Sequence, residues 1–294
     1  LLSMQVLRND SGSITLHMTK YIEELLKKYL PDGYKSKSRL GPRSMPYSPR
    51  FEGHIATALS LGSVSEPAFP DLVKPFQQRI GSLMYLSCSC RPDIAFAVAK
   101  LCTCMARPTP ELMDEVDHLL EYLNVHKSVG LTYQTGVSAL EGMSDANWAT
   151  HRSTSGWAIK WQGAAISWGS KKQDCTALST CEAEIIALSE ASKDMVYLRK
   201  LVRGIDASAI NGPSSLSTDN KGAQDTAYNS EHHSRMKHVE RRHFYVRDMI
   251  EAFELRVPHV ATDDNYSDFL TKPMSNVTTF LKFRALVMGE PAHA

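Results

Sequence analysis

The sequence has no long hydrophobic run and no dominant charge of either sign. No stretch approaches the about 18 consecutive apolar residues of a membrane span, and no basic start followed by an apolar signal core opens the chain. The 33 lysines and arginines nearly balance 32 aspartates and glutamates, for a formal net charge of +1. Charge therefore gives no global signal for nucleic acid, although a local basic face can serve such a partner. We expect an intracellular protein without a membrane partner.

Cysteine is also sparse, and its spacing does not favour a metal site. Two C-x-C pairs separated by a short spacer occur among the six cysteines, which are Cys88, Cys90, Cys102, Cys104, Cys175 and Cys181. Such pairs are known from zinc sites. However, the apolar pattern predicts helices here, and residues two apart on a helix lie about 200° apart, so they cannot face one ion. Reduced thiols buried as small hydrophobes are the favoured interpretation.

The length and composition predict two globular domains. With 294 residues, 43% of them hydrophobic and 22% charged, the chain can bury two cores. Its first six residues are typical of the middle of a strand, so we expect a fragment or a processed product.

The first part of the chain, 1–135, is predicted to be mainly α-helical. Apolar residues at helical spacing predict a helix over 15–30, whereas 34–70, rich in Ser, Pro and Gly, predicts a long loop or linker. Helical patterns resume over 80–86, 94–105 and 112–123. Thr109 is the expected N-cap of the last helix, with Pro110 at its first position.

Beyond Gly136 the pattern predicts strands with short connections. Strands are predicted over 140–145, 157–161 and 165–168, as an antiparallel meander. The expected elements that follow are a long helix over 180–202, a strand over 215–219, a helix over 236–253, a strand over 255–260 and a final helix. For 136–294 this order predicts an α/β fold with a mixed five-stranded sheet and flanking helices, because the later strands need crossovers to pair in parallel.

Three aspartates lie where such a sheet can bring carboxylates together. Asp145 and Asp219 each end a predicted strand, and Asp268 stands at the opening of the predicted last helix. Each one alone fits an ordinary structural role, since Asp is common in turns and at helix N-termini. Convergence at one sheet edge would instead offer hard oxygen ligands, which suit Mg²⁺.

Glu184 gives a more specific signal. At about 100° per residue it falls within about 40° of an apolar line on the long helix, formed by Leu188, Ala191, Met195, Leu198 and Val202. A carboxylate that continues a buried stripe is costly unless a cation compensates it, which favours a metal ligand. Glu182 is predicted on the opposite, solvent-facing side of this helix.

These acids lie within a series of short motifs. The motifs are SDANWA at 144–149, RSTSGW at 152–157, ISW at 166–168, SKKQ at 170–173, ALSTCEAE at 177–184, DN at 219–220 and LTKP at 270–273. Together, in this order and spacing, they resemble the ribonuclease H domain of copia-type retrotransposon Pol polyproteins. The resemblance implies a ribonuclease H-like fold for 136–294. It places Asp145, Glu184, Asp219 and Asp268 on the four acidic positions of that family's active site.

The resemblance also implies a reaction. It is endonucleolytic hydrolysis of the RNA strand of RNA/DNA hybrids, with the four acids as ligands of two Mg²⁺ ions and with Mn²⁺ as a substitute. One ion would lower the pKa of the attacking water and the other would stabilise the leaving 3′ oxygen, at a separation of about 4 Å. Specificity would come from the 2′-hydroxyls of one strand in an A-like groove.

Upstream motifs extend the resemblance to nearly the whole chain. Segments similar to the reverse transcriptase thumb and connection, which follow the palm, are MTKYIEELL at 18–26, GSLMYL at 81–86 and RPDIAFAV at 91–98. The polymerase signature of an aromatic residue, any residue and two aspartates does not occur, so no polymerase activity is expected from this chain alone. The expected partners are an RNA/DNA hybrid and the remaining palm and fingers or a partner subunit, in cytoplasmic virus-like particles or the nucleus.

Basic residues near the motifs are candidate phosphate contacts. They are Lys171 and Lys172, together with Arg235, Lys237, His238 and Arg241 in a stretch similar to a His-Ser-Arg-x-Lys-His segment of the family. A solvated helix start explains that stretch equally well. Its three histidines, at five-residue spacing, do not share a helix face, which disfavours zinc. His259 lies too early relative to Asp268 to match the histidine of cellular and retroviral relatives, so product release stays unassigned.

Two departures from the family pattern keep rival functions open. Glu-Ala-Glu-Ile stands at 182–185 where Glu-Ala-Glu-Tyr is usual, and Cys181 replaces Thr or Ser. These changes would suit a decaying element copy, whereas the intact acids argue for activity.

One rival function is a catalytically silent or domesticated hybrid-binding scaffold. Another is an integrase-like nuclease with an Asp, Asp, Glu set, but here the glutamate comes second in sequence, which favours ribonuclease H.

Overall fold

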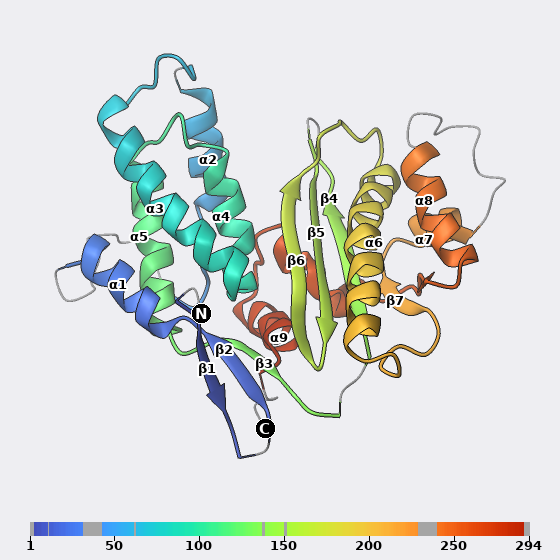
Figure 1. Ribbon diagram of the computed structural model, residues 1–294. Coiled ribbons are helices and arrows are strands. Elements are labelled where there is room, and N and C mark those ends of the chain that lie inside the picture. Colours follow the sequence, from blue (N-terminus) through green and yellow to red (C-terminus); the bar gives the residue numbers. More distant parts are fainter. Residues whose placement is uncertain are drawn as a thin grey trace. The chain divides into compact units, whose positions relative to one another are not determined.

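The computed structural model describes residues 3–10, 12–31, 43–61, 63–136, 139–149, 152–228 and 240–290, the last range without the side chains of 240–243. The chain divides into two units, and it passes from one to the other more than once. Figure 1 labels helices and strands of the described residues. The first unit comprises Leu1–Leu131 and Pro273–Leu281, and the second comprises Thr132–Lys272 and Lys282–Ala294. Within the described ranges, no helix is long and apolar enough to cross a membrane.

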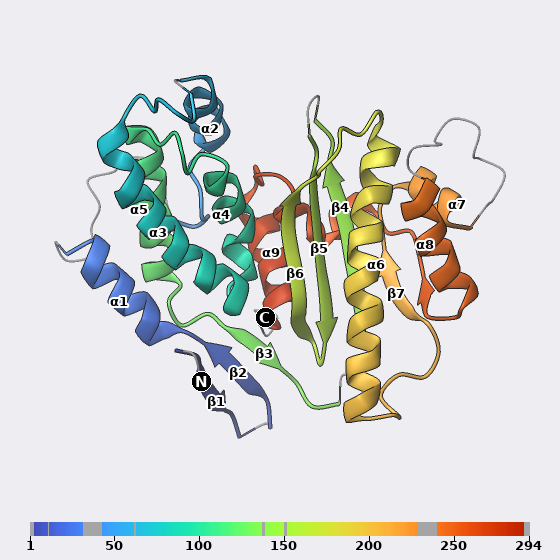
Figure 2. The same ribbon diagram turned by 45° about the horizontal axis from the view of Figure 1, so that its top comes forward.

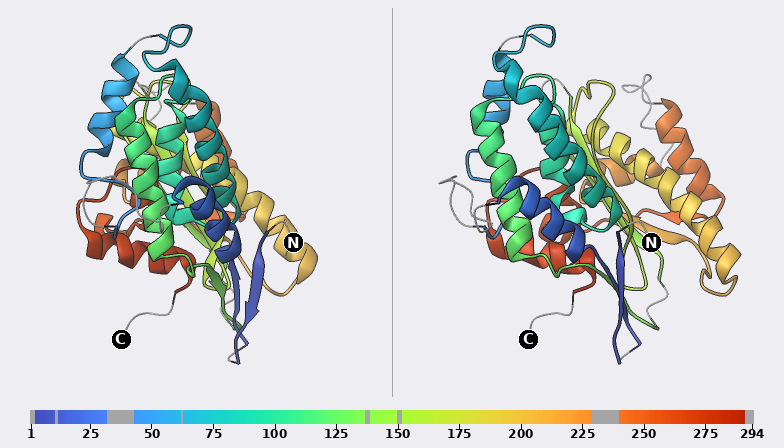
Figure 3. Two further views of the ribbon diagram at one scale, coloured as in Figure 1. Left: turned by 90° about the vertical axis from the view of Figure 1, so that its left-hand side faces the viewer. Right: turned by 60° about the vertical axis from the view of Figure 1, so that its left-hand side comes forward.

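Helices dominate the first unit, as the sequence predicts. They are α1 (Thr19–Tyr29), α2 (Phe51–Ser60), α3 (Pro70–Ser89), α4 (Ala95–Cys102) and α5 (Pro110–Val125), with a 3-10 turn over Pro92–Ile94. α3 packs against α4 and α5 (Figure 3). Thr109 caps α5 as expected, because its side chain accepts a hydrogen bond from the Leu112 N–H at 3.3 Å, and Pro110 is the first helical residue.

A small sheet begins the chain and corrects one predicted boundary. β1 (Gln5–Arg8) pairs antiparallel with β2 (Ile14–His17), and β3 (Leu131–Tyr133) is the third strand of this sheet. The predicted helix over 15–30 is therefore wrong at its start, since pairing with β1 keeps the chain extended through His17. Local apolar spacing does not detect a strand partner of that kind.

The predicted loop over 34–70 is wrong in its second half. Phe51, Ile55 and Ala58 form the buried face of α2, at a spacing of four and three residues. Because Ser, Pro and Gly are frequent around this short helix, the composition of the segment predicts a loop instead. Residues 32–42 lie outside the described part of the chain.

The six cysteines, all within the described ranges, are not joined in disulfides, and they are not all buried as predicted. Cys90 and Cys104 are buried, whereas Cys88 is exposed. The helix predicted over 94–105 ends as α4 at Cys102.

The second unit contains the mixed five-stranded sheet that the sequence predicts, which confirms the α/β class. Its strands are β4 (Glu141–Asn147), β5 (Thr154–Trp161), β6 (Ala164–Lys172), β7 (Ser214–Ser217) and β8 (Leu255–Arg256), in the spatial order β6-β5-β4-β7-β8. β4, β5 and β6 form the expected antiparallel meander. β7 joins β4 in parallel, and β8 joins β7 in parallel.

One long helix, α6 (Thr180–Ile205), lies against this sheet (Figure 2). It packs on β4 and β5 and also contacts α7 (Lys221–Tyr228) and α8 (Glu240–Glu251). Its buried line is the predicted one, namely Leu188, Ala191, Met195, Leu198 and Val202, and the line meets Ile159 and Leu216 in the core. α7 was not among the predicted helices. The last helix, α9 (Val277–Met288), begins in the first unit and ends in the second.

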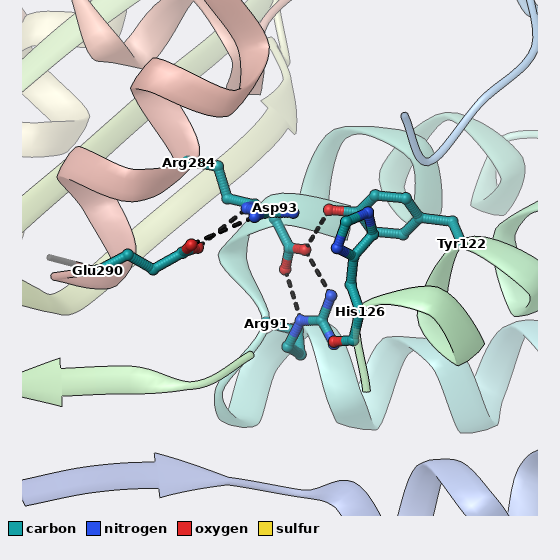
Figure 4. A network of polar contacts seen from close by, with 6 residues as sticks. All are labelled: Arg91, Asp93, Tyr122, His126, Arg284 and Glu290. Carbon is teal, nitrogen blue, oxygen red and sulfur yellow. Dashed lines mark hydrogen bonds and ion pairs between the residues drawn. The ribbon is translucent and has the colours of Figure 1, made fainter. Parts of the chain in front are cut away.

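A buried ion pair links the 3-10 turn of the first unit to α5. Arg91 Nη2 lies 2.6 Å from Asp93 Oδ2, and both side chains are fully buried (Figure 4). The Tyr122 hydroxyl donates to the same carboxylate at 2.7 Å, and Arg91 Nη1 donates to the His126 carbonyl at 3.0 Å. The carboxylate is thus the charge that compensates a guanidinium removed from water.

Replacing this carboxylate is expected to weaken the first unit strongly. Asp93→Ala leaves the Arg91 charge buried and uncompensated, a change that typically costs about 3–5 kcal/mol. Glu23→Gln is the control, because the Lys127–Glu23 pair is exposed and such pairs contribute about 1 kcal/mol or less. Urea unfolding followed by circular dichroism measures both variants. Equal midpoints for the two would contradict the structural role of Asp93.

Gly156 allows another segment to lie directly on β5. A Cβ at this position would come 2.5 Å from Thr271 Cγ2 and 2.9 Å from Leu270 Cβ, closer than carbon atoms can approach. Any side chain here would therefore push away the segment that follows the 3-10 helix Tyr266–Leu270. This close approach explains why the fifth residue of RSTSGW is glycine.

The expected effect of Gly156→Ala is a lower melting temperature, since overpacking at a rigid contact costs about 1–3 kcal/mol. Gly204→Ala in α6 is the matched control. A Cβ at Gly204 meets nothing within 4 Å, so alanine should stabilise the helix by about 0.4–1 kcal/mol. Thermal unfolding distinguishes the two signs, and a stable Gly156→Ala variant would show that the close approach is not required.

Candidate active site

The structure brings the predicted acids to one end of the sheet from four separate elements. Asp145 lies on β4, Glu184 on the first turns of α6, Asp219 just after β7, and Asp268 in the 3-10 helix Tyr266–Leu270. The carboxylates of Asp145, Glu184 and Asp219 each offer an oxygen, and these atoms lie within 4.8 Å of one another. Asp145, Glu184 and Asp268 are buried.

Strand register explains how the first two aspartates meet. Met143 of β4 pairs with Ser217 of β7 in a parallel ladder, and Asp145 and Asp219 each follow two residues later. Because side chains alternate along strands, both carboxylates leave the same face at the same edge. Glu184 reaches them from α6, and its Oε1 accepts a hydrogen bond from the Ala146 N–H at 3.2 Å.

Asp268 reaches the cluster differently from the prediction. It was expected to open the last helix, but α9 begins only at Val277. Asn265 fixes the 3-10 helix that carries Asp268, since its side chain donates to the Ser144 carbonyl at 3.1 Å and accepts from the Ser267 N–H at 3.1 Å. The buried Asn265 amide, as the N-cap of this short 3-10 helix, therefore holds Asp268 beside β4.

Burial and mutual repulsion raise the pKa values of the clustered acids. Removal from water raises the pKa of Asp145, and the nearby Asp268 carboxylate raises it further. Desolvation likewise raises the pKa of Glu184, with Asp145 and Asp219 as the next causes. Burial also raises the pKa of Asp268, although a hydrogen bond from Lys272 opposes that rise. A positive charge placed among these carboxylates would therefore stabilise their ionised forms.

Two residues of this cluster were not identified from the sequence. Lys272 Nζ lies 2.8 Å from Asp268 Oδ2, and the Thr271 hydroxyl donates to Asp145 Oδ2. Burial disfavours the charged lysine, but its hydrogen bond to Asp268 and the surrounding carboxylates raise the pKa of Lys272 above its ordinary value. The LTKP motif included both residues, and the four-residue spacing from Asp268 to Lys272 was the available signal.

The arrangement fits a divalent cation. Within the described ranges, Glu184 Oε2 and Asp268 Oδ1 are buried oxygens without a hydrogen-bond partner. Unpaired buried carboxylate oxygens are costly, and hard cations such as Mg²⁺ prefer oxygen ligands of this kind. Asp145, Glu184 and Asp219, whose oxygens lie within 4.8 Å of one another, are the residues that could hold such an ion, and Asp268 interacts with Asp145 beside them.

The predicted solvent-facing position of Glu182 is wrong. Its side chain is buried, with 2% of the residue exposed, and its Oε2 accepts a hydrogen bond from the Leu178 N–H at 2.7 Å. The Glu182 N–H donates to the Ser179 hydroxyl at 3.1 Å. This is a capping arrangement at the start of α6, so the carboxylate turns back over the helix N-terminus.

The candidate phosphate contacts are only partly described. Lys171 and Lys172 are exposed at the end of β6, and Lys171 Nζ lies 3.4 Å from Asp174 Oδ2. Arg241 lies in α8, but its side chain is outside the described part of the chain, as are Arg235, Lys237 and His238. His259 is exposed, and its Nε2 lies 3.0 Å from the Asp219 carbonyl oxygen.

Two solved structures share similarity with part of the chain. Ribonuclease H1 from the archaeon Halobacterium salinarum is 15% identical, with a TM-score of 0.35, and the match covers 45% of this chain and 94% of that one. LC11-ribonuclease H1 in complex with an RNA/DNA hybrid is 12% identical, with a TM-score of 0.35, over 45% of this chain and 93% of the other. The assignment below is based on the sequence relatives.

No family model matches the chain, whereas several curated proteins do. It is 31% identical over 278 residues, 92% of its length, to the retrovirus-related Pol polyprotein of transposon TNT 1-94 from Nicotiana tabacum. It is 34% identical over 223 residues, 74% of its length, to that of transposon RE1 from Arabidopsis thaliana. Over 129 residues, 42% of its length, it is 40% identical to secreted RxLR effector protein 161 of Plasmopara viticola, of which 91% is covered.

The chain spans 20% of the TNT 1-94 polyprotein and 15% of the RE1 polyprotein. The matches to both polyproteins extend over most of this chain. This chain belongs to the Pol polyproteins of copia-type retrotransposons.

Proposed function

We propose that this chain hydrolyses the RNA strand of RNA/DNA hybrids as part of a retrotransposon reverse transcriptase. The observation that carries the proposal is the convergence of Asp145, Glu184 and Asp219 within 4.8 Å, with Asp268 beside them. Buried carboxylates that lack donors suit a metal-assisted phosphodiester hydrolysis. Membership in the Pol polyprotein family supports the same reaction.

In this proposal each acid is a metal ligand rather than a general base. The Ala146 N–H orients Glu184 through Oε1, which leaves Oε2 available. The Thr271 hydroxyl orients Asp145 in the same way. Two Mg²⁺ ions, when bound, would activate the attacking water and stabilise the leaving 3′ oxygen.

Lys272 takes a compensating role. Its ammonium lies 2.8 Å from Asp268 Oδ2 and reduces the repulsion that the acids exert on one another and on a phosphate. Lys171 and Lys172, exposed at the end of β6, are proposed to contact backbone phosphates of the hybrid. Phosphate contacts of this type position the substrate without selecting a sequence.

The remaining parts of the proposal concern the longer protein. Residues 1–135 are proposed to be the thumb and connection region of the reverse transcriptase, and 136–294 the ribonuclease H-like domain. The palm and fingers, from the rest of the polyprotein or from a partner subunit, would supply nucleotide addition. Cytoplasmic virus-like particles or the nucleus are the proposed places of action.

Glu184→Gln, Asp145→Asn and Asp219→Asn are each expected to lower Mg²⁺-dependent cleavage by at least about 100-fold, because even residues that only support metal ligands change activity about 10–100-fold. Hybrid binding should change little, since the basic contacts remain. A labelled RNA/DNA hybrid, incubated with and without Mg²⁺, measures cleavage, and fluorescence anisotropy measures binding.

Glu190→Gln is the control for these substitutions. Glu190 lies on the same helix, but its partner is the exposed Lys193 at 2.8 Å, so the change should leave cleavage at the wild-type level. Turnover retained in all three acid variants would refute the site. A wild-type chain that binds the hybrid and never cleaves it would instead favour the silent scaffold.

The metal-free protein is expected to lose stability as the pH rises. Burial raises the pKa of Asp145 and Glu184 above their values in the unfolded chain, which are about 3.9 and 4.3. The stability that the protonated acids contribute is therefore complete below about pH 4 and is lost as the pH rises through the raised pKa values. Glu184→Gln should weaken this dependence, because one of the responsible acids is gone.

Thermal unfolding between pH 5 and 9 in EDTA measures the pH dependence, and saturating Mg²⁺ should raise the melting temperature most at high pH. The Glu190→Gln variant again serves as the reference. Identical pH profiles for wild type and Glu184→Gln would mean that Glu184 is not buried among the acids.

A further inference from the structure

Two large apolar side chains lie exposed beside the acid cluster. Trp148, three residues after Asp145, has 46% of its surface exposed, and Leu178 has 72% exposed. Neither belongs to the core cluster of Ala177, Ala183 and Ile186, against which Ala146 and Cys175 pack. An exposed tryptophan next to a charged site is unusual enough to need an explanation.

Hydrogen bonds fix this apolar pair in place. The Trp148 indole Nε1 donates to the Ala177 carbonyl at 3.1 Å, which leaves the ring without a free polar group at that end. The next residue, Leu178, is held through its N–H by the buried Glu182 carboxylate at 2.7 Å. Thus the capping carboxylate of α6 also stabilises the loop before that helix, which carries Leu178 and accepts the hydrogen bond from Trp148.

The exposed lysines belong to the same sheet edge. Asn147 at the end of β4 pairs with Thr154 of β5, which in turn pairs with Lys172 of β6. Neighbouring strands lie about 4.8 Å apart, so Asn147 and Lys172 are separated by about 10 Å across this row. Trp148 follows Asn147 directly, and Lys171 precedes Lys172. The edge therefore combines carboxylates, an aromatic surface and positive charge within the width of a nucleic-acid strand.

We propose that Trp148 and Leu178 form a contact surface for the sugars of the RNA/DNA hybrid next to the cleaved phosphate. The inference rests on the proposed function and adds a substrate contact to it. An aromatic face packs on sugars and bases without regard to sequence, and lysines near it hold phosphates. Hybrid duplexes are recognised largely through the sugars of the shallow groove, which an edge-mounted tryptophan can reach.

The acid cluster needs such a contact. Its carboxylates repel phosphates, so substrate affinity has to come from groups around them as well as from bound cations. Lys171 is already 3.4 Å from Asp174, which reduces its free charge. Apolar contact with sugars is independent of salt and of the metal, and it would set the register of the strand relative to Asp145.

Binding to a labelled, non-cleaved hybrid in Ca²⁺ tests the proposal. Trp148→Ala is expected to weaken binding about tenfold or more, as loss of one aromatic contact does in single-strand-binding proteins. Trp148→Phe keeps an aromatic face and should retain most of the affinity. Leu178→Ser, at a largely exposed position where folding is not at risk, should weaken binding by a smaller factor.

Tyr197→Ala is the matched control. Tyr197 is an even more exposed aromatic residue, 66% exposed, and lies about 20 Å from Glu184 along α6, so its loss should not change hybrid affinity. The metal-induced rise in melting temperature should be the same in Trp148→Ala as in the wild type, because no metal ligand is changed.

The outcomes separate this inference from the proposed function. If Trp148→Ala and Leu178→Ser bind the hybrid as tightly as the wild type, the contact surface is refuted even when cleavage is observed. If the wild type binds the hybrid, loses affinity in Trp148→Ala and never cleaves, the contact stands and the hydrolase assignment falls. A wild-type chain that binds no hybrid would refute both.

Discussion

The buried carboxylates at the end of the second unit's sheet impose the main constraint on this structure. Each of them loses hydration, and each repels the others, so the ionised carboxylates can stay together only with compensating positive charge. Lys272 supplies part of that charge at 2.8 Å from Asp268, and backbone and hydroxyl donors supply part of the lost hydrogen bonding. The remaining unpaired oxygens, Glu184 Oε2 and Asp268 Oδ1, show that protein groups alone do not complete the balance within the described ranges.

The need for positive charge near the carboxylates explains why two chain segments lie unusually close together beside them. Lys272 can reach Asp268 only if the chain between them turns tightly, and the 3-10 helix over Tyr266–Leu270 provides that turn. This 3-10 turn lies directly on β5, where a side chain would collide with it. Gly156 has no side chain and leaves the necessary space. The ion pair between Lys272 and Asp268 therefore depends on the 3-10 turn, and the position of that turn depends on glycine at residue 156.

Features set by local periodicity could be predicted from the sequence, whereas features set by tertiary partners could not. The buried line that Glu184 continues follows from helical spacing alone, and the Thr109 cap follows from local chemistry. Glu182 was misplaced because the angular position on a helix does not reveal a carboxylate that turns back to cap the N-terminus. The α2 helix was missed because its buried face is short and lies within a segment rich in turn-forming residues.

The path of the chain after Lys272 limits how recombination can separate the two units. Pro273–Leu281 belongs to the first unit, where Phe280 contacts Tyr47 and Tyr122, and the chain then returns to the second unit. A single recombination junction near residue 131 would therefore leave the first unit incomplete, because its segment Pro273–Leu281 would stay with the second unit. The second unit would keep all of its own residues after such an exchange, whereas the first unit would lose the packing of Phe280 against Tyr47 and Tyr122.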